Sequence, residues 1–210
     1  MKKILLIISL FISTLAQAQF MTDVNGRPVK ELIYTDIDGS PYLRDEWSVG
    51  LIKTRSGKSQ QLARVRYDAY QDELEYDQAG KYFRLASEIS EFSCIDGTFR
   101  NGYSEIDNHT KSSFYQILYD GKTKVLKKIA VRVIAEKPYG SATDVKRFLK
   151  EETLYLAING ELKAIKKDKK AILLVLIDKK DQLETFIKDQ KLKLSNEDDI
   201  LKVVEKYDTL

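Results

Sequence analysis

The sequence predicts an α+β protein, in which a mainly antiparallel β meander forms a sandwich or a partly open barrel and two or three helices follow. Three observations predict this class. Gly follows a polar residue at seven points up to Gly160, the last of them Asn159-Gly160. Short runs with strand-like alternation separate these points. Beyond Gly160 neither Gly nor Pro occurs, and the apolar residues take helical spacing.

The first 18 residues have the organisation of a secretory signal peptide. Lys2 and Lys3 precede an apolar stretch from Ile4 to Leu15, and Ala16-Gln17-Ala18 supplies the small residues of a cleavage site. The apolar stretch is shorter than the ~20 residues that span a bilayer. We therefore expect an exported protein, periplasmic or extracellular, that begins at Gln19 and has no integral membrane segment after cleavage.

The composition of the mature chain excludes several classes of function. Removing 18 of the 210 residues leaves 192, and the loss of two lysines lowers the formal net charge from +3 to +1. So small a charge predicts no nucleic-acid partner. A single His and a single Cys exclude a His- or Cys-rich metal site and an internal disulfide. We expect no metal and no cofactor.

Residues 19–166 are predicted to form the β-rich part of the protein, with nine to eleven strands. From residue 125 to 133 apolar residues fall mostly on odd positions, which predicts a half-buried strand. Lys124, Lys128 and Arg132 should therefore lie on its exposed face. The clearest predicted strands are 62–67, 73–76, 82–86, 114–120, 125–133, 154–158 and 161–165.

Residues 167–210 are predicted to form a helical segment packed on the same domain, with two or three helices between about 168 and 208. Ser195, with Asp198 three residues later, fits a helix N-cap. The five lysines between Lys163 and Lys170 are expected on a solvated helix face. The segment 144–150 (DVKRFLK) is ambiguous, because Val145, Phe148 and Leu149 suit a short helix but the segment is barely two turns long.

Several segments resemble a group of uncharacterised exported bacterial proteins that has no established activity. They are FRNGY at 99–103, FYQILYDGKTKVLKK at 114–128, LYL at 154–156 and KKDKK at 166–170, and the resemblance covers roughly residues 99–210. The shared motifs are hairpin turns and a helical tail. The resemblance therefore implies export and this fold, and it implies no mechanism.

The sequence contains no arrangement typical of nucleophilic catalysis. His109 lies in a polar stretch typical of a surface loop, and Cys94 is expected to be a small buried hydrophobe or, alternatively, to form an intermolecular disulfide. Residues 36–39 (DIDG) resemble the start of a calcium loop, but the spacing of the later ligands is wrong. We interpret this segment as a turn.

An acidic cluster is the strongest candidate for chemistry. It consists of Asp68, Asp72, Glu73, Glu75 and Asp77, and if Glu73 and Glu75 share a strand they face the same side. Neighbouring carboxylates could perform acid/base catalysis or hold a cation. The simpler interpretation is a solvated loop and a charged strand edge.

Aromatic residues are the remaining candidates for a binding surface. The chain has 12 tyrosines, and four of them lie close together in sequence: Tyr67, Tyr70, Tyr76 and Tyr82. Tyr on a sheet can belong to the core, line a ligand site or contact a partner. These four tyrosines, with Glu73 and Glu75, are the predicted ligand or partner contacts.

The sequence therefore predicts an exported protein that acts by binding or interaction in the cell envelope, and it favours a non-enzymatic role. The partner would be an unknown protein or a small apolar ligand. Two alternatives stay open. One is a periplasmic carrier of an apolar ligand, and the other is a hydrolase that uses carboxylates such as Glu73 and Glu75.

Overall fold

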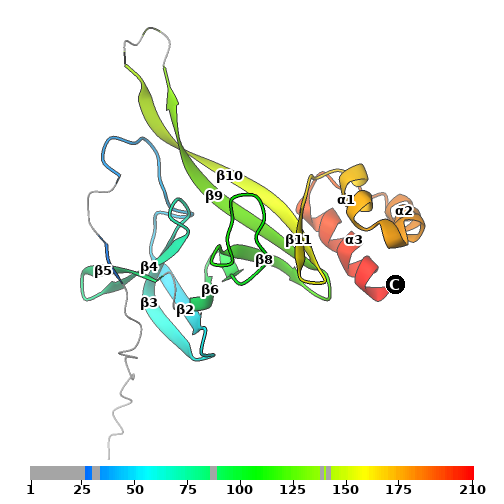
Figure 1. Ribbon diagram of the computed structural model, residues 1–210, viewed down its shortest axis with the longest axis horizontal. Helices are drawn as coiled ribbons and strands as arrows, with labels where there is room; N and C mark the ends of the chain where they lie inside the picture. Colours follow the sequence, from blue (N-terminus) through cyan, green and yellow to red (C-terminus); the bar gives the residue numbers. More distant parts are fainter. Residues whose placement is uncertain (1–26, 30–33, 86–88, 138–139, 141–142) are drawn as a thin grey trace, which may run out of the picture.

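The computed structural model describes residues 27–29, 34–85, 89–137, 140 and 143–210. In this part of the chain eleven strands pair antiparallel in one open sheet, in the order β1-β5-β4-β3-β2-β6-β7-β8-β9-β10-β11 (Figure 1). The predicted α+β meander with C-terminal helices is confirmed. The signal-peptide prediction lies outside the described residues.

The strands are β1 (Arg27–Pro28), β2 (Ser48–Thr54), β3 (Ser59–Asp68), β4 (Glu73–Gln78), β5 (Lys81–Leu85), β6 (Ile89–Cys94), β7 (Gly97–Arg100), β8 (Tyr115–Asp120), β9 (Lys124–Glu136), β10 (Val145–Ile158) and β11 (Glu161–Ile165). The helices are α1 (Lys169–Val175), the 3-10 helix η1 (Ile177–Lys179), α2 (Lys180–Asp189) and α3 (Glu197–Thr209).

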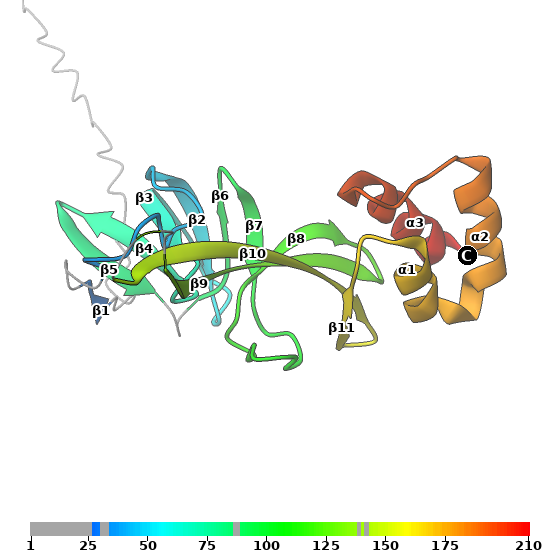
Figure 2. The same cartoon turned by 90° about the horizontal axis from the view of Figure 1, so that it is seen from above.

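The sheet consists of two meanders, β2–β5 and β6–β11, joined where β2 pairs with β6. The molecule is elongated, with β1–β5 at one end and the helices at the other (Figure 2). The long β9–β10 hairpin runs between the two ends. Its register continues from Val145 opposite Glu136 to Ala157 opposite Lys124.

The turn chemistry of the sequence is realised at several hairpins. Asn159 and Gly160 have φ angles of 52° and 85°, and Ala79 and Gly80 have φ angles of 54° and 80°. These positive pairs are the type I′ geometry that suits a two-residue hairpin. Asn101-Gly102 does not form a two-residue hairpin turn, because it begins the long connection between β7 and β8.

The ambiguous segment 144–150 forms the start of β10, apart from its first residue. A helix of two turns is barely stable by itself, whereas as a strand this segment extends the antiparallel pairing of β10 with β9. The predicted N-cap at Ser195 is wrong by one residue. Asn196 caps α3 by accepting a hydrogen bond from the backbone N–H of Asp199 at 2.8 Å.

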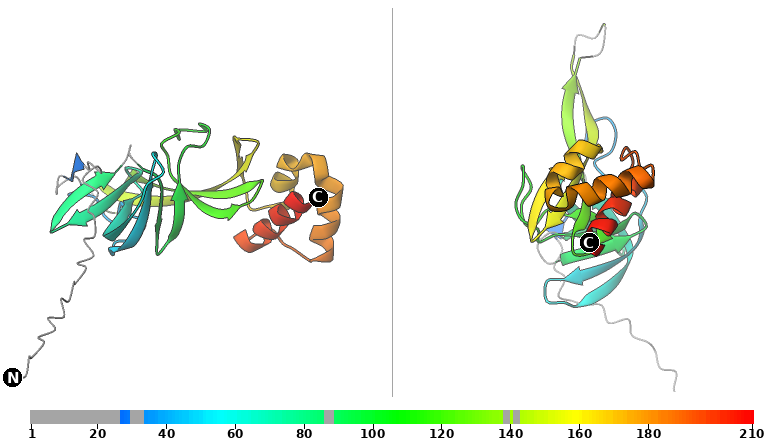
Figure 3. Two further views of the ribbon diagram at one scale, coloured as in Figure 1. Left: turned by 90° about the horizontal axis from the view of Figure 1, so that it is seen from below. Right: turned by 90° about the vertical axis from the view of Figure 1, so that its right-hand side faces the viewer.

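Two main cores hold the ends of the molecule. At the β end, strands β2–β7 and β9 bury a cluster that includes Ile52, Leu74 and Phe92. At the other end the helices pack their apolar faces on β9–β11, with Leu156 and Val204 among the fully buried residues. Figure 3 shows these helices stacked over the end of the sheet.

The end of α3 is fastened to the β8–β9 turn through Asp208, whose carboxylate accepts two 3.0 Å hydrogen bonds from the backbone N–H of Thr123. Gly121 leaves room for this contact. A Cβ at Gly121 would overlap both the Asp208 carboxylate and the ring of Tyr119.

We expect Gly121→Ala to destabilise the protein by about 1–3 kcal/mol, because the added methyl group displaces the Asp208 carboxylate. The midpoint of urea unfolding measures this loss. Gly121→Ala/Asp208→Ala is the control, because removing the carboxylate relieves part of the overlap. Equal stability of Gly121→Ala and the native chain would contradict this expectation, because it would show that the turn accommodates the added methyl group without loss.

Candidate functional site

One face of β3, β4 and β5 carries a row of cross-strand ion pairs. Arg66 on β3, Glu75 on β4 and Arg84 on β5 lie directly opposite one another. Glu75 is fully buried, and its two carboxylate oxygens accept hydrogen bonds from Arg66 Nη2 at 2.9 Å and Arg84 Nη2 at 3.0 Å. Burying the carboxylate is tolerated because two guanidinium groups flank it.

Arg84 also holds a second buried carboxylate. Its Nη2 lies 3.0 Å from Asp68 Oδ2, and Asp68 is fully buried. Asp68 accepts further hydrogen bonds from the Tyr34 hydroxyl and from the backbone N–H groups of Tyr70 and Gln71. Burial raises the pKa of Asp68, and these hydrogen bonds together with Arg84 oppose the rise.

Aromatic rings cover this charged row. The Arg66 guanidinium lies 3.5 Å from the ring centroid of Tyr42 and 4.5 Å from that of Trp47. Tyr82 stacks on Trp47 at a centroid distance of 5.2 Å. Burial, with Glu75 nearby, raises the pKa of Tyr42 to about 12. The rings therefore shield the row from water and strengthen its electrostatic interactions.

The predicted solvated loop and strand edge is therefore wrong for two members of the acidic cluster. Asp68 and Glu75 are buried, and β4 is an interior strand between β3 and β5. Glu73 does face the same side as Glu75, and it forms an ion pair with Arg27 and approaches Arg84 at 3.7 Å. Each carboxylate of the predicted catalytic pair thus contacts arginine.

The four predicted tyrosines occupy different environments. Tyr67 and Tyr76 are buried in the core of the β end, with Tyr76 stacked on Phe83. Tyr82 is half-buried beside Trp47. Tyr70 is 39% exposed and packs edge-on against Tyr34 and Phe148.

A second buried ion pair crosses the sheet from the β3–β4 turn to β9. Lys128 is 3% exposed, and its Nζ lies 2.6 Å from Asp72 Oδ2. The other oxygen of Asp72 accepts hydrogen bonds from the Tyr67 hydroxyl and the Phe114 N–H. The prediction that Lys128 lies on an exposed face is wrong, because Asp72 supplies a counter-charge from a turn 56 residues away.

His109 lies half-buried beside this pair, with its ring centroid 6.1 Å from that of Tyr115. Burial lowers the pKa of His109, and Lys128 lowers it further, while Asp72 and Asp107 act in the opposite direction. The folded protein therefore favours the neutral imidazole.

We expect this preference to make stability fall on acidification. Between the lowered folded pKa and the unfolded value near 6.5, the unfolded chain binds more protons, so the free energy of unfolding decreases as pH drops. Urea unfolding at pH 7.5 and 5.5 should show a smaller loss for His109→Gln than for the native chain. Equal losses would contradict this assignment.

Cys94 ends β6 and is half-buried, with its Sγ 4.0 Å from Asp96 Oδ2. Burial raises the pKa of its thiol. A protonated, partly covered thiol is a weak nucleophile. Among the described residues no group of three or more His, Cys, Asp or Glu side chains could hold a metal ion.

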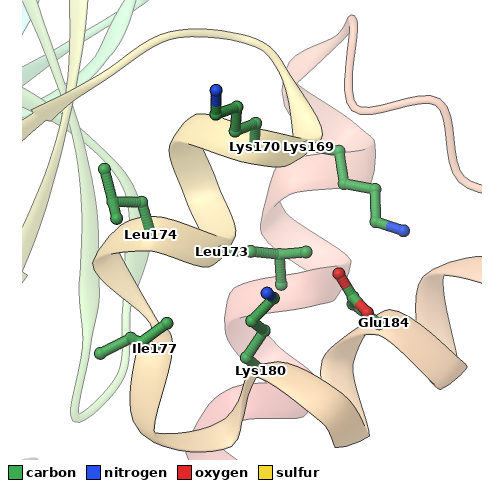
Figure 4. Close-up of a pocket in the computed structure, with 7 residues that line it drawn as sticks. All are labelled: Lys169, Lys170, Leu173, Leu174, Ile177, Lys180 and Glu184. Atoms are coloured by element: carbon green, nitrogen blue, oxygen red, sulfur yellow. The ribbon is translucent and has the colours of Figure 1, made fainter.

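An open groove of about 360 Å³ lies on the helical end (Figure 4). Leu173 lies between Leu174 and Ile177 on one side and Lys169 and Glu184 on the other. The lining residues, all from α1, η1 and α2, are Lys169, Lys170, Leu173, Leu174, Ile177, Lys180 and Glu184.

The groove combines exposed apolar side chains with lysines. Leu174 is 71% exposed and Ile177 is 60% exposed. In the described part of the chain, no carboxylate forms an ion pair with the lining lysines Lys169, Lys170 and Lys180. This site was not predicted from the sequence, although the apolar run from 171 to 177 beside the lysines was its signal.

The fold and this groove define an elongated antiparallel β protein whose helical end presents an apolar surface bordered by lysines. No protein-family model, no curated protein and no solved structure matches the chain. The resemblance to uncharacterised exported bacterial proteins stays a prediction. None of the described helices combines the length and the apolar character needed to cross a membrane.

Proposed function

We propose that this is an exported protein of the cell envelope that acts by binding a protein partner through the groove between α1 and α2. The observation that carries the proposal is the pair of exposed apolar side chains, Leu174 and Ile177, bordered by lysines that pair with no carboxylate of the described chain. Exposed apolar residues that cluster with charged residues around them are typical of interaction sites.

The state of the predicted carboxylate pair supports binding over hydrolysis. A general acid and a general base need pKa values that differ and access to substrate. Glu75 is fully buried between two arginines, and Glu73 contacts Arg27. Both carboxylates contact arginines in this arrangement, and Glu75 is shielded from solvent.

The openness of the groove supports a protein partner over a small apolar ligand. Ligand sites usually enclose most of the ligand's surface. Leu174 and Ile177 are mostly exposed, so a small molecule bound against them would remain largely in water. A protein surface could cover both side chains at once.

The test is site-specific photocrosslinking in intact cells, followed by mass spectrometry of the purified protein. A crosslinker at position 177 should yield one defined protein adduct, and Leu174→Asp should abolish it. Ile95→Asp is the matched control, because Ile95 is also 71% exposed and lies in the β6–β7 turn. The same spectra should show a mature chain that begins at Gln19.

Three outcomes would contradict the proposal. Co-purification of a bound lipid at near-equal stoichiometry would favour the carrier. An adduct that Leu174→Asp and Ile95→Asp reduce equally would show that the groove plays no special part. Recovery of the unprocessed chain from the cytoplasm would contradict the export prediction.

A further inference from the structure

We propose that the occupant of the groove is an acidic amphipathic helix of the partner protein. This inference rests on the proposed function and adds the chemistry and the secondary structure of the bound segment. Three features of the groove carry it: its apolar floor, its unbalanced charge and the helical origin of all its lining residues.

The apolar floor matches one face of a helix. Leu173 is 3% exposed and forms the base, while Leu174 and Ile177 project beside it. An amphipathic helix presents apolar side chains at i, i+3, i+4 and i+7 as a single stripe. Two or three side chains of such a stripe would cover Leu174 and Ile177 and fill a groove of about 360 Å³.

The charge of the lining favours an acidic occupant. Lys169, Lys170 and Lys180 border the floor, against a single carboxylate at Glu184. On the sheet, by contrast, Arg66 and Arg84 have their charges balanced by buried carboxylates. An occupant with Glu or Asp beside its apolar stripe would provide the missing counter-charges and increase the rate of association.

The backbone of the lining favours a helix over an extended peptide. An extended peptide needs a free strand edge to pair its N–H and C=O groups. Every residue that lines the groove belongs to the helical stretch from Lys169 to Glu184, which offers no strand edge. A helix satisfies its own backbone and can lie in the groove without such an edge.

The mixture of charges favours a protein helix over an anionic membrane surface. Glu184 lines the groove, and Asp181 lies one turn before it on α2. A uniformly negative lipid surface would attract the lysines but would also place negative charge against both carboxylates. A protein helix can place one Lys or Arg opposite Glu184 and acidic residues elsewhere.

The test measures binding of a synthetic helix to the whole mature chain by isothermal titration calorimetry. The probe is a capped peptide of about 16 residues, roughly four helical turns, with Leu at the stripe positions and Glu on the flanks. We expect saturable one-to-one binding. Leu174→Asp and the triple variant Lys169→Gln/Lys170→Gln/Lys180→Gln should each weaken it about tenfold or more.

Three controls make the result specific. The same peptide with Lys in place of Glu should not bind, and Ile95→Asp should bind the acidic peptide like the native chain. Raising the salt concentration should weaken binding to the native chain more than to the triple lysine variant. Far-UV circular dichroism and urea unfolding check that each variant is folded.

Failure of this inference is distinguishable from failure of the proposed function. If the position-177 crosslink forms but the acidic helix does not bind, the groove binds a partner of other chemistry and the inference is wrong. If phosphatidylglycerol vesicles bind in a manner that depends on Leu174 and the peptide does not, the groove binds a membrane surface, and both the inference and the proposed protein partner are wrong. If the crosslink, the peptide and the vesicles all fail, the proposed function is wrong as well.

Discussion

Replacing Arg84 with Leu should lower the free energy of unfolding by about 3–5 kcal/mol, the usual loss when one partner of a buried ion pair is removed. Asp68 and Glu75 are both fully buried, and Arg84 donates to each of them at 3.0 Å. Among the described residues, Asp68 then keeps the neutral donors Tyr34, Tyr70 and Gln71, and Glu75 keeps Arg66 as its charged partner. Chemical denaturation at pH 7 measures the loss.

The pH dependence of this loss identifies its cause. Burial already raises the pKa of Asp68, and Arg84 opposes that rise, so the pKa should rise further in Arg84→Leu. The folded variant then binds this proton more tightly than the unfolded chain. Its stability should therefore recover as pH falls through the raised value, and the gap to the native protein should narrow. A gap that does not change with pH would assign the loss to packing alone.

Two variants serve as controls for Arg84. Arg84→Lys keeps the charge but loses the fork that contacts two carboxylates, so an intermediate loss is expected. Arg132→Leu removes an exposed ion pair with Glu151, in which the Arg132 side chain is 58% exposed. Arg132→Leu should lower the free energy of unfolding by less than about 1 kcal/mol. Equal losses for Arg84→Leu and Arg132→Leu would contradict the role given to Arg84.

Breaking the Lys128–Asp72 pair should be the other large effect. We expect Lys128→Met to lower the free energy of unfolding by about 3 kcal/mol, because among the described residues Asp72 then keeps just the Tyr67 hydroxyl and the Phe114 N–H as partners. Asp72→Asn should cost a comparable amount. Asn is the appropriate replacement because the φ angle at position 72 is 59°, which Asn tolerates.

A double-mutant cycle tests whether the two residues act as a pair. The double variant Lys128→Met/Asp72→Asn should lose about 1–3 kcal/mol less than the sum of the single losses. Lys127→Met is a control on the same strand, because the Lys127 side chain is 13% exposed and pairs with the partly exposed Glu197. Additive losses at positions 72 and 128 would show that the pair contributes no coupling.

The local structure of this protein was largely predictable from local signals. The two-residue turn at Asn159-Gly160, the strand on each side of it and the change to helical structure beyond it are all present in the fold. These features depend on neighbouring residues, such as the positive φ that Gly and Asn tolerate. The N-cap was misplaced by one residue because Ser195 and Asn196 are both good capping residues.

The environment of the charged residues was not predictable in this way. The positions of Lys128 and Glu75 suggested solvent exposure, yet both are buried with counter-charges. Asp72 lies 56 residues from Lys128 in the chain, and the two arginines beside Glu75 lie nine residues away on the neighbouring strands, so the pairing of the strands decides these contacts. The segment 144–150 was ambiguous for the same reason, since its pairing with β9 decides its conformation.

The groove was likewise predictable only in part from the sequence. The sequence places five lysines beside an apolar run, and a helix with one solvated face accounts for both. Only the packing of α1 and α2 against the end of the sheet decides which apolar residues are covered. Leu173 and Leu183 enter the core, whereas Leu174 and Ile177 remain exposed.

By itself the sequence determined the antiparallel meander, the helical tail and the positions of most turns, because these depend on the conformational preferences of adjacent residues. The tertiary structure alone decided which charges are buried together and where an apolar surface stays open. Both depend on the order of strands in the sheet, which brings Asp72 to Lys128 and Asp68 to Arg84. Residues distant in the chain thereby acquire the counter-charges that make their burial possible.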